Sequence, residues 1–286
     1  MALRDLLLSG TPVILDGAMG TCLEDNRWGE QDANLTYPEH VANVHRAYAE
    51  AGSRILLANT LTLNRESAVL QKSPVDLRSA NAAGVRIARE AVPPDRFILG
   101  DIGSTGRLAP CGNLTEDACE AAFREQAETL LEAGTAGLMI ETMTDVREAL
   151  AALRVCRPMT ALPIFVSLAF MTDQRGGRTP MGDAARDCAR QLTDEGADAV
   201  GANCGEITPQ QMATIIAEMA KGTTLPLIAK PNAGKAELVD CRTLYRTHPE
   251  DFAKGMKECT NAGAIFVGGC CGTKPEHIQT ISDLFQ

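Results

Sequence analysis

The chain has 286 residues, of which 45% are hydrophobic and 22% charged, as is ordinary for one large globular domain or two modest ones. Its 37 Asp and Glu residues exceed its 27 Lys and Arg residues, so the formal net charge at pH 7 is −10. This acidic balance argues against broad binding to nucleic acid and against adsorption to anionic membranes, which both favour basic surfaces.

Signals for export or membrane insertion are not evident. No apolar run approaches the roughly 20 residues that a spanning helix needs, and Leu6–Leu8 is too short for the apolar part of a secretory signal. We therefore expect a cytoplasmic protein whose ten cysteines are reduced. Four of them fall in helix-like stretches and are expected to pack in the core: Cys119, Cys156, Cys188 and Cys259. The sequence suggests no role for Cys22, Cys111 and Cys241.

Eight short apolar segments have the character of buried strands. In chain order they cover residues 13–16, 55–58, 97–101, 137–141, 163–168, 199–203, 225–230 and 264–267. Helical periodicity fills the spaces between them and is clearest over residues 116–133, with similar patterns at 79–91 and 183–195. Glycines that favour a helix end follow several of these stretches, at Gly52, Gly134, Gly196 and Gly263.

This alternation of strands and helices predicts an α/β fold with parallel strands. A doubly wound open sheet shows the same alternation, but the count of eight and the chain length favour a single-domain (β/α)8 barrel over residues 1–286. Active sites of such barrels lie at the carboxyl ends of the strands. Polar residues gather at these ends: Asp16-Gly17, Asn59-Thr60, Asp101, Glu141, Asn203-Cys204-Gly205, Lys230-Pro231-Asn232 and Gly268-Gly269-Cys270-Cys271-Gly272.

Three cysteines at two of these strand ends are candidate metal ligands. Cys270 and Cys271 lie between Gly269 and Gly272, and glycine lets both side chains leave the alternation of a strand and turn toward one point. Cys204 ends a strand that lies next but one in the barrel. Three thiolates suit Zn²⁺ and leave its fourth position open, as in catalytic sites. The alternative is three small buried residues that serve only packing.

A resemblance to a known family strengthens the metal interpretation. Gly-Gly-Cys-Cys-Gly-Thr at 268–273 and the following Pro275-Glu276-His277-Ile278 resemble the C-terminal signature of the homocysteine S-methyltransferase family. The chain is most similar to the homocysteine-binding domain of the cobalamin-dependent methionine synthases. Further matches run in order along the chain: Leu15-Asp16-Gly17-Ala18-Met19-Gly20-Thr21, Ala58-Asn59-Thr60, Gly100-Asp101-Ile102-Gly103, Glu141-Thr142-Met143-Thr144-Asp145 and Gly201-Ala202-Asn203-Cys204-Gly205.

The resemblance implies a zinc barrel that methylates the thiol of L-homocysteine to give methionine. One Zn²⁺ per chain would be held by Cys204, Cys270 and Cys271. A metal-bound thiol is deprotonated, and the excess negative charge of four thiolates should keep the substrate sulfur nucleophilic. Asn203 is a candidate provisional fourth ligand when substrate is absent, although an Asn at a strand end more often bonds to a neighbouring loop.

Carboxylates at strand ends are candidates for holding the amino-acid part of homocysteine. Asp16 and Glu141 are the candidate catalytic and ammonium-binding residues, and the resemblance supports Glu141 especially. The substrate carboxylate is expected to meet backbone N–H groups in the turn from Gly17 or near Asn59 and Thr60. Asp101 is a further candidate. The competing structural roles are turn capping for Asp16, a buried structural carboxylate for Glu141 and loop capping for Asp101.

The methyl donor is less clear from the sequence. The resemblance to the cobalamin-linked branch implies a methylcorrinoid protein or methylcobalamin supplied in trans, because the chain has no Asp-x-His motif for a corrinoid of its own. A small onium donor such as S-methylmethionine or betaine, or another thiol acceptor, is the alternative. Aromatic residues that would cage a quaternary ammonium are few: Trp28, Tyr37, Tyr48 and Tyr245 are the only Trp and Tyr. A non-catalytic subunit that binds zinc or homocysteine within a larger complex is a third possibility.

Overall fold

The computed structural model describes residues 2–24, 32–107, 113–240 and 242–285. Trp28, Cys111 and Cys241 lie outside these ranges. Eight parallel strands form one sheet in the order β1-β10-β7-β6-β5-β4-β3-β2. They are β1 (Val13–Ile14), β2 (Ile55–Leu57), β3 (Phe97–Ile102), β4 (Gly137–Met143), β5 (Ile164–Leu168), β6 (Ala199–Asn203), β7 (Leu227–Lys230) and β10 (Ala264–Val267).

The two edges of this sheet meet and nearly close it. A single parallel bridge joins Leu15 to Ile55, and the Arg54 N–H donates to the Ile14 carbonyl at 2.8 Å. The predicted (β/α)8 barrel is therefore confirmed. All eight predicted strands are present, with boundaries that agree to within two residues.

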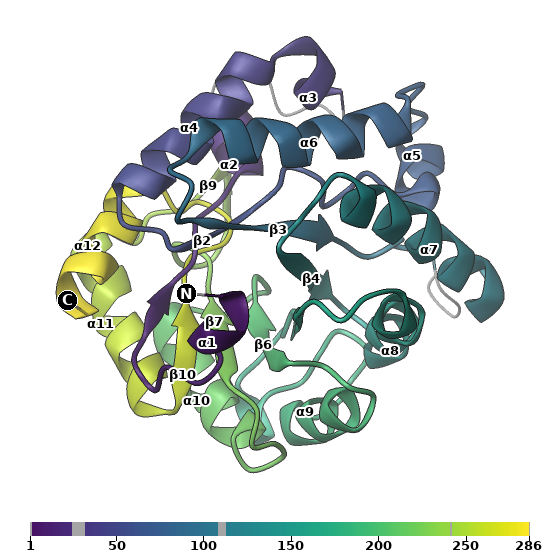
Figure 1. Ribbon diagram of the computed structural model, residues 1–286. Coiled ribbons are helices and arrows are strands. Elements are labelled where there is room, and N and C mark those ends of the chain that lie inside the picture. Colours follow the sequence, from purple (N-terminus) through teal and green to yellow (C-terminus); the bar gives the residue numbers. More distant parts are fainter. Residues whose placement is uncertain (1, 25–31, 108–112, 241, 286) are drawn as a thin grey trace.

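A ring of eight helices covers the outside of the barrel (Figure 1). In chain order they are α4 (Pro38–Glu50), α6 (Leu77–Ala91), α7 (Glu116–Glu132), α8 (Val146–Cys156), α9 (Ala185–Asp194), α10 (Pro209–Met219), α11 (Pro249–Asn261) and α12 (Pro275–Phe285). The short helix α1 (Leu3–Leu6) precedes β1. Further short helices lie in the connections: α2 (Gly20–Glu24), α3 (Ala33–Thr36), α5 (Arg65–Gln71) and the 3₁₀ turns η1 (Arg157–Met159) and η2 (Gln174–Gly176). None of the helices in the described ranges is both long and apolar enough to cross a membrane.

Helix ends follow the sequence signals. The side chains of Thr115 and Thr208 cap α7 and α10 by accepting from the backbone N–H groups of Ala118 and Gln211. Four glycines just past helix ends adopt positive φ as predicted, namely Gly52, Gly134, Gly196 and Gly263. The core between strands and helices includes the four cysteines expected to pack there, all fully buried: Cys119, Cys156, Cys188 and Cys259.

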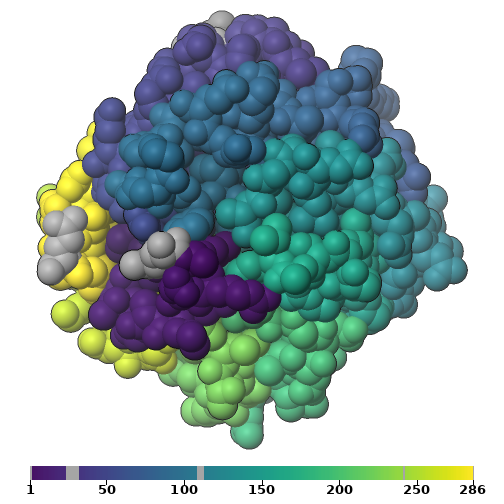
Figure 2. All heavy atoms as spheres, in the orientation of Figure 1, coloured from purple at the N-terminus to yellow at the C-terminus, as the bar shows by residue number. Residues whose placement is uncertain are grey.

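The amino end of the barrel is plugged. Leu3 and Leu6 of α1 are buried against inward-facing strand residues such as Leu99, Phe165 and Phe266. Figure 2, in the orientation of Figure 1, shows the dark purple atoms of this N-terminal segment filling the middle of the face. Access to the barrel interior is therefore from the opposite, carboxyl end of the strands.

One feature of the carboxyl end was not predicted. Between β7 and α11 the chain forms an antiparallel hairpin of β8 (Glu237–Val239) and β9 (Arg242–Leu244). Both strands are exposed, so the hairpin lacks the buried, continuous apolar run by which the barrel strands were recognised.

Candidate active site

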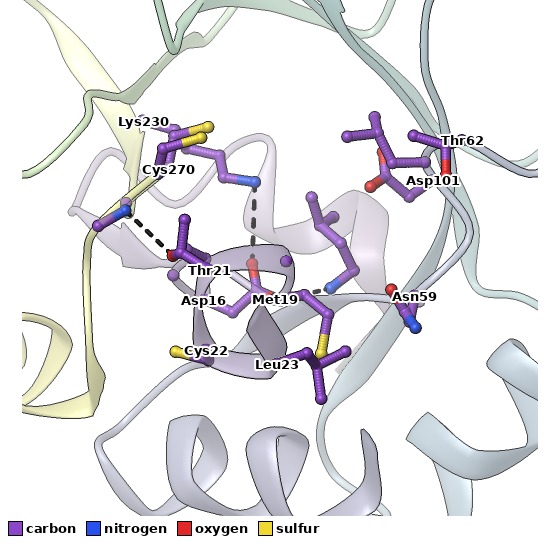
Figure 3. A pocket seen from close by; sticks show the side chains of 18 of the residues that line it. Asp16, Met19, Thr21, Cys22, Leu23, Asn59, Thr62, Asp101, Lys230 and Cys270 are labelled. Atoms are coloured by element: carbon purple, nitrogen blue, oxygen red, sulfur yellow. Dashed lines mark hydrogen bonds and ion pairs between the residues drawn. The ribbon is translucent and has the colours of Figure 1, made fainter. Parts of the chain in front are cut away.

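A cavity of about 1020 Å³ opens at the carboxyl end of the barrel. Its walls come from the segments after β1, β2 and β10, from the carboxyl-terminal parts of β3, β4 and β7, and from the hairpin strand β9. Eight of the residues that the sequence singles out line it: Asp16, Gly17, Asn59, Thr60, Asp101, Glu141, Cys270 and Cys271. Figure 3 shows several of these side chains directed toward one another from the different strand ends.

Three sulfur atoms meet beside this cavity, and two of them belong to residues that line it, Cys270 and Cys271. The Sγ atoms of Cys204, Cys270 and Cys271 all lie within 4.8 Å of one another, and those of Cys204 and Cys271 are 3.9 Å apart. Across the described ranges, no other group of three His, Cys, Asp or Glu side chains brings its ligand atoms together in this way. The structure thus brings together the predicted cysteine triplet from β6 and β10, and this cluster could hold a metal ion.

Unusual backbone conformations direct these thiols. Cys204 adopts a positive φ of 55°, and Gly205 follows at 81°. A Cβ at Gly205 would lie 2.1 Å from the Phe170 carbonyl oxygen, so only glycine fits there. Gly272, at φ 77°, packs against the ring of Tyr245, which a Cβ would approach to 2.2 Å. The glycines around the cysteines therefore have the role that the sequence predicted for them.

Strand β7 lies between β6 and β10, and residues at its carboxyl end form hydrogen bonds with the backbone of all three cysteines. The Cys204 N–H donates to the Lys230 carbonyl at 3.1 Å, and the Cys270 N–H donates to the Pro231 carbonyl at 2.8 Å. The Ala233 N–H donates to the Cys271 carbonyl at 2.9 Å. The end of β7 thus fixes the spacing of all three sulfurs.

Asn203 is fully buried behind the sulfur cluster and is not among the residues that line the cavity. Its Oδ1 accepts from the Thr142 N–H at 2.9 Å and from the Ser167 hydroxyl at 2.7 Å. Its Nδ2 donates to the Thr142 hydroxyl at 2.7 Å and lies 3.8 Å from Cys270 Sγ. Asn203 Oδ1, the atom that could bind a metal, therefore already accepts two hydrogen bonds from barrel residues.

Asn232, to which the sequence assigned no role, has the opposite arrangement. Its Nδ2 donates to the Gly205 carbonyl at 2.9 Å. Its Oδ1 is buried and has no hydrogen-bond partner among the described residues. A buried amide oxygen without a partner is costly, and this one belongs to the segment that contacts all three cysteine backbones.

An acidic cluster, formed by Asp16, Asp101 and Glu141, lies in the same cavity around Lys230. Lys230 ends β7, and its side chain is only 2% exposed. Its Nζ donates to Glu141 Oε2 at 2.8 Å. The same atom lies 3.8 Å from Asp16 Oδ1, and a dashed line joins the two side chains in Figure 3. From the sequence, Lys230 was identified only as a polar residue at a strand end, with no role assigned to it. Its ion pair could have been predicted, because Lys230 directly follows the apolar residues Leu-Ile-Ala of a barrel strand. Such a position is buried, and a buried ammonium needs a counter-ion.

Burial dominates the electrostatics of this cluster. It raises the pKa of Asp16 to about 7, although Lys230 and the Leu57 N–H oppose the shift. Burial and then the charge of Glu141 raise the pKa of Asp101 well above its usual range. Burial alone would lower the pKa of Lys230, but Glu141 and Asp16 outweigh it and raise the value. The lysine is therefore a fixed positive charge at neutral pH.

The remaining predicted residues shape the cavity wall. A Cβ at Gly17 would lie 2.7 Å from both the Thr273 hydroxyl and the Tyr48 ring. The Asn34 side-chain amide donates to the Asn59 backbone carbonyl at 2.7 Å, and Asn59 Nδ2 donates to Asn34 Oδ1 at 3.0 Å. The Thr60 hydroxyl donates to the Asp101 carbonyl at 2.8 Å and accepts from its N–H at 3.0 Å. Thr60 thus holds the strand end that presents Asp101.

A plugged (β/α)8 barrel with a three-thiol cluster and carboxylates at its open end belongs to the class of barrel proteins with a candidate metal site. Comparison with known proteins agrees with this class and identifies the family. The family model described as homocysteine S-methyltransferase matches residues 13–285, so the chain belongs to that family. The predicted family is confirmed.

Sequence relatives include the methionine synthases of Mycobacterium leprae and Mycobacterium tuberculosis. Each is 29% identical over an alignment of 302 positions that covers 97% of this chain and 25% of the relative. The chain thus spans about a quarter of the length of these curated relatives.

Solved structures with the same fold include the homocysteine methyltransferase MmuM of Escherichia coli. The chain superposes on the metallated form with a TM-score of 0.81 and 22% identity over 99% of both chains. The apo form gives a TM-score of 0.77 and 24% identity over 98% of both.

Proposed function

We propose that the protein transfers a methyl group to the thiol of L-homocysteine, giving methionine, with one Zn²⁺ per chain. The observation that carries this proposal is the three-sulfur cluster of Cys204, Cys270 and Cys271, which opens onto a cavity lined by carboxylates. Membership of the homocysteine S-methyltransferase family, and relatives named methionine synthase, support the acceptor and the product.

The residues present suit a zinc ion. Three thiolates are soft ligands of the kind zinc accepts, and the orphaned Oδ1 of Asn232 offers an oxygen from the adjoining strand end. We therefore assign the provisional fourth position to Asn232 rather than Asn203, whose oxygen accepts two hydrogen bonds. When bound, the metal would keep the substrate sulfur as a thiolate at neutral pH, where a free thiol is mostly protonated.

The rest of the cavity would hold the amino-acid part of the substrate. The ammonium group enters the acidic cluster of Asp16, Asp101 and Glu141. The cavity wall at Gly17, Asn59 and Thr60 lies beside it and offers backbone polar groups to the carboxylate. In the reaction a carbon–sulfur bond forms while the bond from the methyl carbon to the donor breaks, and the donor leaves with that electron pair.

For the donor we propose a methylcorrinoid protein, or methylcobalamin, supplied in trans. The similarity to the mycobacterial proteins named methionine synthase, of which the chain matches about a quarter, supports this choice. A cavity of about 1020 Å³ also exceeds what homocysteine alone would fill.

A donor comparison tests the proposal. Zinc-loaded protein is incubated with L-homocysteine and one of three methyl donors: methylcobalamin, S-methylmethionine or betaine. The methionine formed with each donor is quantified. We expect methionine from methylcobalamin in the wild type and none from a Cys270→Ser variant. Turnover only with an onium compound would replace the proposed donor. Zinc binding without turnover on any free or protein-bound donor would favour a non-catalytic subunit.

A further inference from the structure

One polar side chain of the outer helix α7 contacts the wall of the cavity from behind. Gln126 is only 2% exposed, and its Nε2 donates to the Thr60 carbonyl at 2.8 Å and to the Asp101 carbonyl at 3.4 Å. Thr60 follows β2 and Asp101 lies near the end of β3, and both line the cavity, whereas Gln126 is not among the lining residues. Gln126 therefore acts on the cavity only through the backbone of these two residues.

Close packing of α7 on β3 brings Gln126 to this place. A Cβ at Gly100 would lie 3.0 Å from the Leu130 side chain, so the glycine lets the helix approach the strand. Gln126 precedes Leu130 by four residues and lies on the same face of α7. Because each barrel helix runs back against its strand, this earlier turn of α7 lies nearer the carboxyl end of β3, where the cavity opens.

The carboxamide of Gln126 is paired on one side only. Its Nε2 has a third acceptor in Asn81 Oδ1 of α6, at 3.3 Å. Its Oε1 is buried and has no hydrogen-bond partner among the described residues, an arrangement that lowers stability. An unpaired buried group of this kind calls for an explanation other than packing.

The two carbonyls do not need Gln126 to be paired. The Leu63 N–H donates to the Thr60 carbonyl at 3.0 Å, and the Thr60 hydroxyl donates to the Asp101 carbonyl at 2.8 Å. What Gln126 adds is a single donor group shared by both carbonyls, which fixes the segment after β2 relative to the end of β3. Asn59 and Leu61, on either side of Thr60, also line the cavity.

We propose that Gln126 is a positioning residue for the thiol substrate. It sets the wall formed by residues 59–61 and Asp101, and thereby the fit of the amino-acid part of homocysteine, without touching the substrate. This inference rests on the proposed function, because it takes homocysteine as the substrate. It assigns a role in the site to a residue of an outer helix.

The test compares L-homocysteine with 1-propanethiol, which is homocysteine without its ammonium and carboxylate groups. Dissociation constants are measured by calorimetry on zinc-loaded wild type, Gln126→Met and Gln126→Leu, two apolar changes of different shape. Thr129→Val is the matched control, because Thr129 is 4% exposed in the same helix and its hydroxyl donates only to the Glu125 carbonyl, at 3.1 Å. Zinc content and urea denaturation are measured for each variant.

We expect both Gln126 changes to weaken homocysteine binding by about 3- to 10-fold, the fold-change that one neutral hydrogen bond is worth. Binding of 1-propanethiol should stay within about twofold, because the metal-binding cysteines do not contact Gln126. Gln126→Met removes the unpaired Oε1 but leaves Asn81 Oδ1 without its donor, so the two effects on stability oppose each other. The urea midpoint should therefore stay close to that of Thr129→Val.

Two results would overturn the proposal. Unchanged homocysteine binding in both Gln126 variants would show that the wall does not depend on this side chain. Equal weakening of both thiols, together with a lower urea midpoint, would show that Gln126 serves only the fold. A wild type that binds zinc and 1-propanethiol but not homocysteine would instead refute the proposed function, and this inference with it.

Discussion

The side chain of Asn203 holds Thr142 in a left-handed backbone conformation. Asn203 Oδ1 accepts from the Thr142 N–H at 2.9 Å, and its Nδ2 donates to the Thr142 hydroxyl at 2.7 Å. Thr142 has φ 59°, which a β-branched residue rarely adopts. It lies where the register of β4 against β5 shifts, between Ile140 and Met143. This irregularity directs the preceding residue, Glu141, into the cavity.

Removing the Asn203 side chain should therefore cost stability through Thr142. We expect Asn203→Ala to lower the free energy of unfolding by about 2 to 4 kcal/mol, because the three hydrogen bonds to Thr142 and Ser167 are lost and the strain remains. Adding Thr142→Gly should recover roughly 1 kcal/mol, since glycine adopts this conformation without strain. Urea denaturation measures both. A Thr142→Gly change that further destabilises Asn203→Ala would contradict this account of the pair.

Two glycines in one segment provide a matched test of the cavity wall. Gly17→Ala should destabilise the fold by about 1 to 3 kcal/mol, because the new Cβ would lie 2.7 Å from Thr273 and from Tyr48. Gly20→Ala should be neutral or stabilising, since nothing lies within 4 Å of its Cβ position and alanine favours a helix. Thermal denaturation compares them. Equal melting temperatures for the two variants would show that the close packing at Gly17 is not needed.

Asp16 should make stability depend on pH. It faces Lys230 on β7, Glu141 on β4, Asp101 on β3 and the Leu57 N–H. Burial raises its pKa to about 7 in the native state, against 3.8 ordinarily. The native state therefore holds the proton that the unfolded chain releases, and stability falls as pH rises between these two values, by at most about 1.4 kcal/mol per pH unit.

In the Asp16→Asn variant, residue 16 does not titrate, so its contribution to the pH dependence of stability is lost. The free energy of unfolding of Asp16→Asn relative to wild type should therefore increase from pH 4.5 to pH 7 and level off above it. Denaturant titrations of both proteins across this range measure the difference. A difference that is constant with pH would mean that Asp16 has the same pKa in the folded and unfolded states.

A metal bound by the cysteine cluster should stabilise the native state. At free zinc about 1,000-fold above its dissociation constant, the gain is about 4 kcal/mol. A chelator should lower the melting temperature of the wild type and of Cys188→Ala, because Cys188 is a buried cysteine in α9 that does not belong to the cluster. It should leave the melting temperature of Cys271→Ser unchanged. Chelator sensitivity in Cys271→Ser would place the metal elsewhere.

Much of the fold was predictable because its signals are local and repeated. Buried parallel strands appear as short apolar runs, and helix-ending glycines such as Gly134 and Gly196 separate them from the preceding helices. The hairpin of β8 and β9 was not predicted, because its strands are exposed and only three residues long. Its pairing depends on its place above the barrel rather than on a hydrophobic pattern.

The site was predictable in its residues but less so in their pairing. Barrel topology alone brings Cys204 near Cys270 and Cys271, so the cluster followed from the strand count. Side-chain hydrogen bonds between distant strands cannot be read from one sequence. For this reason the ion pair of Lys230 with Glu141 and the engaged oxygen of Asn203 emerge only from the structure.

Metal content and metal-dependent homocysteine binding, measured on one preparation, test the central claim most directly. The protein is purified under reducing conditions, its zinc is quantified, and L-homocysteine is titrated by calorimetry with and without chelator. The account predicts one zinc per chain and homocysteine binding that the chelator abolishes. Freshly reduced protein without zinc, or homocysteine binding that the chelator leaves intact, would contradict it.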